Sequence, residues 1–325
     1  MKGILVKSTI LLGLLAAALQ LAAAQQWPTR PIKAVVPFPA GGGTDLMGRL
    51  VAKHLGDRLG QQVYVENIGG ANGSIGTQAV MRAEPDGYTI GVISDGPMIV
   101  NPALYPNNPY VPLRDFAPVA MINRFPSMLT AHPSTGIKTV ADLIRVAKEK
   151  PGTLNYSSGG IGNFSHMGLE LLANQTGIKI THVPYRGIGP ATQAILTGEV
   201  QLLYNNVTTS LEHVKAGKTN GLAIGEGKRL EGLSDIPTIA ETVPGYEFSA
   251  WIGLYAPAKT PPEIVAKLSK AVSDLLEDPS VKDYFSKQFI TASYKNPDQL
   301  AAYVKSELVK WDDVVKKAGI KVQQQ

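Results

Sequence analysis

The chain has 325 residues, of which 31 are basic, 26 are acidic and none is cysteine, so its formal net charge is +5. Without cysteine there is no disulfide framework and no lipidated cysteine. The lysines and arginines are scattered, with no basic run and no basic motif interleaved with aromatic residues, so no nucleic-acid partner is expected.

The N-terminus has the pattern of a secretory signal peptide. Lys2 and Lys7 precede an apolar stretch at residues 10–19, and small residues follow it. This pattern predicts a signal peptide at residues 1–24, cleaved after Ala24; a retained anchor is the alternative, although the stretch is shorter than the roughly 20 residues of a membrane span. Cleavage lowers the basic count from 31 to 29 against 26 acidic residues, a net charge of +3. The mature protein is then exported, most simply to a bacterial periplasm.

The mature length suits two lobes better than one small core. Strands alternate with helices in the first part of the chain, which is typical of a mostly parallel α/β sheet. Strands are expected at residues 32–37, 63–66 and 89–93, and helices at residues 44–59 and 73–83. After a proline-rich stretch at residues 101–112, apolar runs around 116–122 and 127–132 are expected to carry the chain into a second lobe.

The same alternation continues in the second lobe. Helices are expected at residues 139–149, 164–176 and 188–198, and strands at residues 153–157, 179–183 and 200–204. The apolar run WIGLYA at residues 251–256 suggests the return crossing, after which helices from Pro261 onward pack on the first lobe. The expected boundaries are 27–125 with 248–325 for the first lobe and 126–247 for the second. Two crossings leave a cleft between the lobes, a usual place for a ligand.

The stretch PFPAGGGTDLMGR places three glycines between the first strand and the first helix. Thr44 is a suitable N-cap and Asp45 suits the first helical turn. Backbone amides beside the positive end of a helix dipole form an anion seat, and glycines let an anion approach them closely. The alternative is a tight strand-to-helix turn without a ligand.

A second glycine-rich loop repeats this design in TLNYSSGGIGNFSHMGL, residues 153–169. Because the carboxyl ends of the strands face the cleft, the two loops are placed to hold one anion from opposite sides. Ser157, Ser158 and Ser165 would add hydroxyl donors.

Other chemistries find no support in the sequence. The spacing Gly160-x-Gly162-x-x-Ser165 approaches a dinucleotide fingerprint, but ITHVPYRG lacks the carboxylate that binds ribose, and no GK[ST] loop is present, so no cofactor is expected. Ser165 and His166 point about 100° apart on a helix, and no G-x-S-x-G elbow exists, so no catalytic residue is assigned. Five histidines without an H-E-x-x-H motif or a cysteine predict no metal site.

Seven segments resemble the Bug/TctC family, the periplasmic solute-binding proteins of tripartite tricarboxylate transporters. They are WPTRPIKAVVPFPAGGGTDLMGR, ENIGGANGSIGT, PDGYTIGV, SSGGIGNFSHMGLELL, HVPYRG, IPTIAE and WIGLYAPAKTP, which keep their order over essentially the whole mature chain. The resemblance implies a two-domain Venus-flytrap fold (type II) that captures a small carboxylate and delivers it to a membrane permease. Ligand classes across the family include di- and tricarboxylates, acidic amino acids and aromatic carboxylates.

The resemblance also implies the ligand-binding residues. The first loop falls on residues 38–45 and the second on residues 157–166, with backbone amides holding the carboxylates and Phe38 covering the apolar part of the ligand, although a core role suits Phe38 nearly as well. Arg186 is a rim candidate or a solvated surface charge. The expected set is Phe38, Gly42, Gly43, Thr44, Asp45, Ser94, Ser157, Ser158, Gly159, Gly162, Ser165, His166, Tyr185 and Asn205.

Two departures from the family pattern affect the ligand. Asn72 stands where relatives often have glycine, and it adds a polar contact or tolerates a left-handed turn. Asn205, followed by Asn206, stands where many relatives carry an acid, which weakens the case for recognising an ammonium group. An asparagine can instead donate to a second carboxylate. The sequence therefore favours a carboxylate without an amine.

The expected function is capture of a di-, tri- or aromatic carboxylate by a monomeric periplasmic protein for a tripartite tricarboxylate transporter permease. The alternatives are a ligand sensor for a membrane receptor, or a hydrolase or lyase that acts on a carboxylate in the same cleft.

Overall fold

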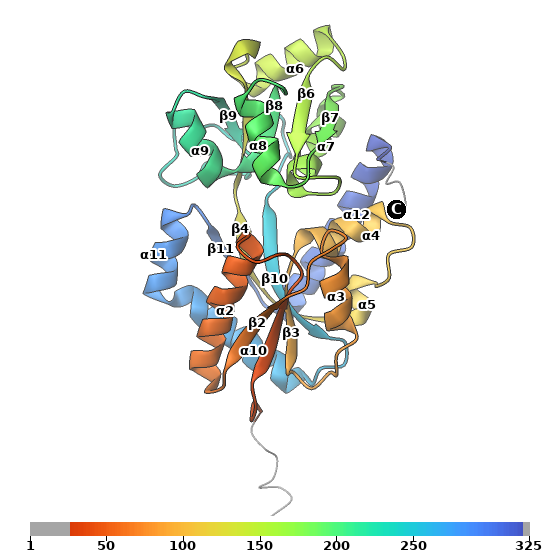
Figure 1. Ribbon diagram of the computed structural model, residues 1–325, viewed down its shortest axis with the longest axis vertical. Coiled ribbons are helices and arrows are strands. Elements are labelled where there is room, and N and C mark those ends of the chain that lie inside the picture. The colour runs from red at the N-terminus through yellow and green to blue at the C-terminus, as the bar shows by residue number, and fades with distance from the viewer. Residues whose placement is uncertain (1–26, 321–325) are drawn as a thin grey trace, which may run out of the picture.

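The computed structural model describes residues 27–320, and Figure 1 shows two α/β lobes stacked along the long axis of the molecule. The first lobe, drawn below, is built on a six-stranded sheet with strand order β11-β4-β10-β3-β1-β2. The second lobe is built on a five-stranded sheet with strand order β7-β6-β8-β5-β9. The expected signal peptide at residues 1–24 lies outside the described residues.

The first lobe takes its elements from both ends of the chain. Its strands are β1 (Ile32–Val36), β2 (Val63–Asn67), β3 (Thr89–Ser94), β4 (Phe116–Phe125), β10 (Ala250–Pro257) and β11 (Thr291–Lys295). Its helices are α2 (Gly43–Leu59), α3 (Ser74–Met81), α4 (Asn101–Leu104), α5 (Pro112–Asp115), α10 (Pro262–Glu277), α11 (Pro279–Lys287) and α12 (Pro297–Ala318), with the π-helical turn η1 (Gly96–Val100) before α4.

The second lobe is a continuous piece of chain. Its strands are β5 (Ser127–Ala131), β6 (Asn155–Ser158), β7 (Thr181–Pro184), β8 (Leu202–Asn206) and β9 (Asn220–Ile224). Its helices are α6 (Val140–Glu149), α7 (Phe164–Thr176), α8 (Ile188–Leu196) and α9 (Val207–Lys215), with short 3₁₀ turns η2 (Pro133–Thr135) and η3 (Ile239–Glu241).

The strands and helices expected in each lobe are confirmed, with ends displaced by at most two residues. The expectation of mostly parallel sheets was wrong, because both sheets are mixed. Strand β1 pairs in parallel with β2 and β3, and β6 with β7 and β8. Strands that lead into or out of a crossing, such as β4, β5 and β10, pair antiparallel with their neighbours. The proline-rich stretch, for which no element was predicted, holds α4 and the start of α5, because proline suits the first helical turn.

Two crossings connect the lobes. The first is short, since β4 ends at Phe125 and β5 begins at Ser127. The second returns the chain from β9 to β10. Arg124 joins the two crossings through ion pairs with Glu226 at 3.4 Å and with Glu247 at 2.6 Å.

Helix α12 packs against β4 in the first lobe and against α7 in the second. Its buried Trp311 meets the ring of Phe248, in the second crossing, edge to face with ring centroids 4.8 Å apart. Burial of such a side chain contributes about 1.5–3 kcal/mol. The C-terminal helix thus supports the hinge as well as the first lobe.

Candidate functional site

The first glycine loop lies between β1 and α2 and is exposed from Gly41 to Gly43. Helix α2 begins at Gly43, and its N-cap is Gly42 in an extended conformation with φ −83° and ψ 167°. The prediction that Thr44 is the N-cap was wrong, because the helix begins one residue before it. Gly42 has no side chain, so within the described residues no side-chain cap occupies the first-turn amides. These amides remain available to an anion.

Asp45 faces the loop rather than the solvent and is only 2% exposed. Its Oδ2 accepts hydrogen bonds from the Gly41 amide at 2.9 Å and from Arg49 Nε at 3.0 Å, and its Oδ1 accepts one from Asn67 Nδ2 at 2.9 Å. Burial opposes ionisation, but these donors outweigh it and hold the pKa of Asp45 below its ordinary value. The carboxylate therefore braces the loop, and its charge is largely compensated.

Phe38 precedes the glycines and is half-buried. Its carbonyl accepts a hydrogen bond from Asn67 Nδ2 at 3.0 Å, and its ring lies within 3.1 Å of where a Cβ on Gly73 would stand. The backbone at Gly73 has φ +82°, which favours glycine. The ring thus fills the space beside the start of α3, as in the core role left open by the sequence.

The second glycine loop, between β6 and α7, uses its own side chains as acceptors for its amides. The Gly159 amide donates to Ser165 Oγ at 3.0 Å, and the Gly162 amide donates to His166 Nδ1 at 3.2 Å. The Ser158 hydroxyl oxygen accepts a hydrogen bond from the Gly160 amide at 3.1 Å. Unlike α2, helix α7 has a side-chain N-cap, since Asn163 accepts from the Ser165 amide. This loop is therefore internally satisfied at the amides that were expected to hold a ligand.

Beneath the second loop, His166 and His182 stack with ring centroids 4.0 Å apart. Burial, reinforced by His182, lowers the pKa of His166 to about 3, and burial lowers the pKa of His182 to about 4. Both rings are neutral near pH 7. Neutral His166 accepts the Gly162 amide at Nδ1, so its remaining proton is on Nε2, 3.8 Å from Glu170 Oε1. These contacts give His166 a structural role in the loop.

Three other expected hydroxyl or amide donors already have partners within the second lobe. The Ser157 hydroxyl donates to the Ala191 carbonyl at 2.8 Å. The Tyr185 hydroxyl donates to Glu199 Oε1 at 2.7 Å. Asn205 is buried, and its Nδ2 lies 3.3 Å from Thr192 Oγ1.

Two further expectations concern the first lobe. Ser94 is half-buried and ends β3, where the chain turns into η1. Asn72 adopts a left-handed φ of +47°, as one of the two alternatives held, and its Nδ2 makes a contact within the first lobe by donating to Asn101 Oδ1 at 2.8 Å.

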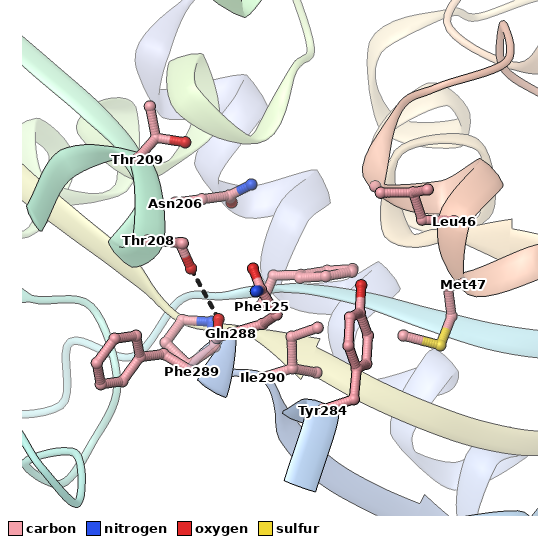
Figure 2. A pocket seen from close by; sticks show the side chains of 12 residues that line it. Leu46, Met47, Phe125, Asn206, Thr208, Thr209, Tyr284, Gln288, Phe289 and Ile290 are labelled. Atoms are coloured by element: carbon pink, nitrogen blue, oxygen red, sulfur yellow. Dashed lines mark hydrogen bonds between the residues drawn. The ribbon is translucent and has the colours of Figure 1, made fainter. Parts of the chain in front are cut away.

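A pocket of about 240 Å³ lies between the lobes, beside the first loop (Figure 2). Its walls come from α2, the first crossing, the end of β8 with the start of α9, and α11 with the segment after it. None of the twelve described residues that line it is charged: Gly43, Leu46, Met47, Phe125, Pro126, Asn206, Thr208, Thr209, Tyr284, Gln288, Phe289 and Ile290. The pocket therefore combines the exposed end of α2 with largely apolar walls.

Sequence reasoning found only Gly43 in this pocket. The start of α9 was missed although NNVTT follows a strand and carries residue types that favour a helix N-terminus. Leu46, Phe125 and Tyr284 gave no signal, because single apolar residues in amphipathic elements look like core residues.

Within residues 27–320, no cluster of three or more His, Asp or Glu side chains could hold a metal ion. In the same range, no helix has the length and hydropathy to span a bilayer.

Two α/β lobes joined by two crossings, with a pocket and an uncapped helix start between them, define a two-lobe periplasmic binding protein. The chain belongs to the family described as the tripartite tricarboxylate transporter family receptor, TctC, whose model matches residues 47–320. This confirms the expected family, fold and class: the protein is a solute-binding receptor, not an enzyme.

Relatives of known sequence and structure agree with this assignment. Protein BugT of Bordetella pertussis is 36% identical over 301 residues, which make up 92% of each chain. The structure of Rpa4515 of R. palustris with adipate is 36% identical, has a TM-score of 0.80 and matches 91% of this chain and 99% of its own. MatC of Rhodopseudomonas palustris with bound malate is 33% identical, has a TM-score of 0.77 and matches 89% of this chain and 100% of its own.

Proposed function

We propose that this chain captures a small organic carboxylate between its lobes and delivers it to the membrane permease of a tripartite tricarboxylate transporter. The observation that carries the proposal is the start of α2, where Gly42 and Gly43 are exposed and no side chain caps the amides. Solved relatives with adipate and malate support the ligand class.

The first loop would receive one carboxylate. The amides of Gly42, Gly43 and Thr44 and the Thr44 hydroxyl are the donors, and the helix dipole favours a negative charge there. A hydrogen bond to a charged group contributes roughly 1.5–3 kcal/mol net, and micromolar affinity corresponds to about 8 kcal/mol. About four such bonds therefore approach micromolar affinity without an arginine clamp.

The nearby Asp45 carboxylate does not oppose this seat, because three donors compensate its charge. The second loop, with Ser158, Gly159, Gly162 and Ser165, would meet the ligand from the other lobe as a rigid surface. The proposed set is completed by Ser94 in the first lobe and by four residues that act through the shape of the second lobe: Ser157, His166, Tyr185 and Asn205.

The proposal includes the layout of the exported protein. A signal peptide at residues 1–24 would be removed before the mature monomer acts in the periplasm. The first lobe would comprise residues 27–125 and 248–325, and the second residues 126–247. A ligand that touches both lobes binds their closed arrangement better and so shifts the protein toward it.

The test is a thermal-shift screen of the mature protein, freed of co-purified ligand by unfolding and refolding. Adipate, malate, citrate, aspartate and benzoate represent the carboxylate classes, and the corresponding neutral amides serve as matched controls. A compound that binds only the folded state raises the melting temperature. We expect at least one acid to raise it while its amide does not. A flat response to every acid by folded protein would contradict the proposal.

A further inference from the structure

Phe289 belongs by sequence to the first lobe but packs into the second. It lies in the turn between α11 and β11. Its ring contacts an apolar cluster whose other members all come from the second lobe: Met128, Val207, Leu211, Val214, Ile224, Leu230, Leu233 and Ile236. Figure 2 shows the ring on the opposite side of the pocket from Leu46 and Met47.

The backbone at Phe289 is strained. Its φ of +51° lies in the left-handed region, which a bulky side chain rarely adopts. Four hydrogen bonds hold the turn. The Gln288 amide donates to the carbonyls of Tyr284 at 3.1 Å and Phe285 at 3.2 Å, the Phe289 amide donates to the Ser286 carbonyl at 3.2 Å, and the Ile290 amide donates to the Phe285 carbonyl at 2.8 Å. The turn is a helix C-cap, in which the residue after the last turn adopts the left-handed conformation and is usually glycine. A phenylalanine there carries a conformational cost that its packing must offset.

A hydrogen bond between the lobes accompanies the ring. The Thr208 hydroxyl, at the start of α9, donates to the Gln288 carbonyl at 2.7 Å across 80 residues of sequence. Figure 2 shows this bond at the edge of the inter-lobe pocket, and Thr208, Gln288 and Phe289 all line that pocket together with Gly43. The contact between the lobes is therefore continuous with the proposed ligand seat.

The lobes also meet on the opposite flank. A Cβ placed on Gly162, in the second loop, would stand 2.7 Å from Leu104 Cδ1 and 3.5 Å from Asn72 Nδ2, both in the first lobe. The two flanks therefore hold the lobes close together, with the pocket between them.

We infer that Phe289 is a positioning residue, which holds the two lobes at the separation that ligand binding requires. The inference rests on the proposed function for its consequence, but the contact itself does not depend on that function. With the Phe289 ring in the second lobe, the hinge is restrained at a further point besides the two crossings, α12 and the contact at Gly162. Removal of the ring lowers the fraction of molecules in the binding arrangement, and the apparent dissociation constant rises by the inverse of that fraction.

The test measures the distance between the lobes in the ligand-free protein. The chain has no cysteine, so Lys53→Cys on α2 and Lys148→Cys on α6, both exposed, give a uniquely spin-labelled pair. Phe289→Ala removes the ring, Phe289→Leu keeps an apolar side chain as the matched control, and Thr208→Val removes only the hydrogen bond. Near-ultraviolet circular dichroism confirms that each variant is folded.

We expect the same distance distribution, with a population at the short distance of the closed arrangement, for the unsubstituted pair and for Phe289→Leu. Phe289→Ala should broaden it toward longer distances, and Thr208→Val should do so to a smaller extent. An unchanged distribution in folded Phe289→Ala would overturn the inference. Should Phe289→Ala fail to fold, Phe289→Gly decides in its place, because it removes the ring at a positive φ that suits glycine: a broader distribution supports the inference and an unchanged one overturns it.

A second readout uses adipate as the probe, by calorimetric titration. We expect Phe289→Ala to raise its dissociation constant about tenfold, equivalent to about 1.4 kcal/mol, with Phe289→Leu close to the unsubstituted protein. An unchanged constant would overturn the inference. Failure of adipate to bind the unsubstituted protein counts only against this ligand, while the distance measurement still decides the role of Phe289.

Discussion

Gly43→Glu separates ligand binding from folding at the first loop. Gly43 is the first residue of α2, and a Cβ there would meet only Phe125 Cζ, at 3.7 Å, an ordinary contact. An acid in the first turn stabilises helix α2 by about 0.3–1 kcal/mol. The ligand-free melting temperature should therefore stay the same or rise.

Binding should be lost in the same variant. The new carboxylate occupies the place of the ligand carboxylate, and two like charges about 4 Å apart repel by about 4 kcal/mol at an effective dielectric constant of 20. Each 1.4 kcal/mol is tenfold in affinity, so the dissociation constant should rise by nearly three orders of magnitude.

The assay is calorimetric titration of the acid identified by the thermal-shift screen, together with thermal unfolding. Gln62→Glu is the matched control, because it adds the same charge at an exposed position where β2 begins, away from the loop. We expect that control to bind as the unsubstituted protein does. Wild-type affinity in Gly43→Glu would refute the seat at the start of α2.

Asp45→Asn should lower the free energy of unfolding by about 1–3 kcal/mol at pH 7, because the hydrogen bonds to its charged form are lost. Since the folded-state pKa of Asp45 is depressed, this contribution exists above the ordinary pKa near 3.8 and disappears as pH falls through the folded value, so denaturant unfolding of the two proteins should converge only below pH 3.8. The pKa values of His166 and His182, about 3 and 4, lie below their ordinary value of 6.5. Unfolding therefore takes up protons below pH 6.5, and the free energy of unfolding should fall between pH 6.5 and 4. The same pH dependence of that free energy in a double variant with both histidines replaced by phenylalanine would contradict this assignment. In ¹H–¹⁵N spectra neither ring should titrate between pH 5 and 8, whereas titration with a pKa near 6.5 would show exposed rings.

The sequence predicted the elements well because their causes are local. The run IKAVV followed by glycines marks a buried strand and its turn, and Gly73 and Gly177 stand beside helix ends with positive φ. Strand direction is not local, however. Nothing in the apolar run of β4 indicates that it pairs antiparallel with β10, more than 120 residues later, and so the sheets were predicted as mostly parallel.

The candidate site was less predictable, because hydrogen-bond partners depend on tertiary contacts. Ser157 and Ser165 look alike in the sequence, yet one donates to the carbonyl of Ala191 and the other accepts the Gly159 amide. Thr44 has good capping chemistry, but the backbone of Gly42 already adopts the extended cap conformation, so the helix begins before Thr44. Phe289 could not be found at all, because the cluster that receives its ring is built from residues of the second lobe that lie far from it in the sequence.

The two glycine loops differ in where their amides find acceptors, and this difference has a consequence for closure. In the second loop, Ser165 and His166 accept hydrogen bonds from the amides of Gly159 and Gly162, which would otherwise have to lose bound water when a ligand arrives. A loop fixed in this way loses little conformational freedom on binding, and preorganisation of that kind raises affinity by lowering the cost of association. At the first loop, by contrast, the amides of Gly43 and Thr44 exchange water for the ligand. In the proposed mechanism the first lobe therefore supplies most of the charge recognition. The rigid second lobe, held close by Phe289, supplies shape and excludes water.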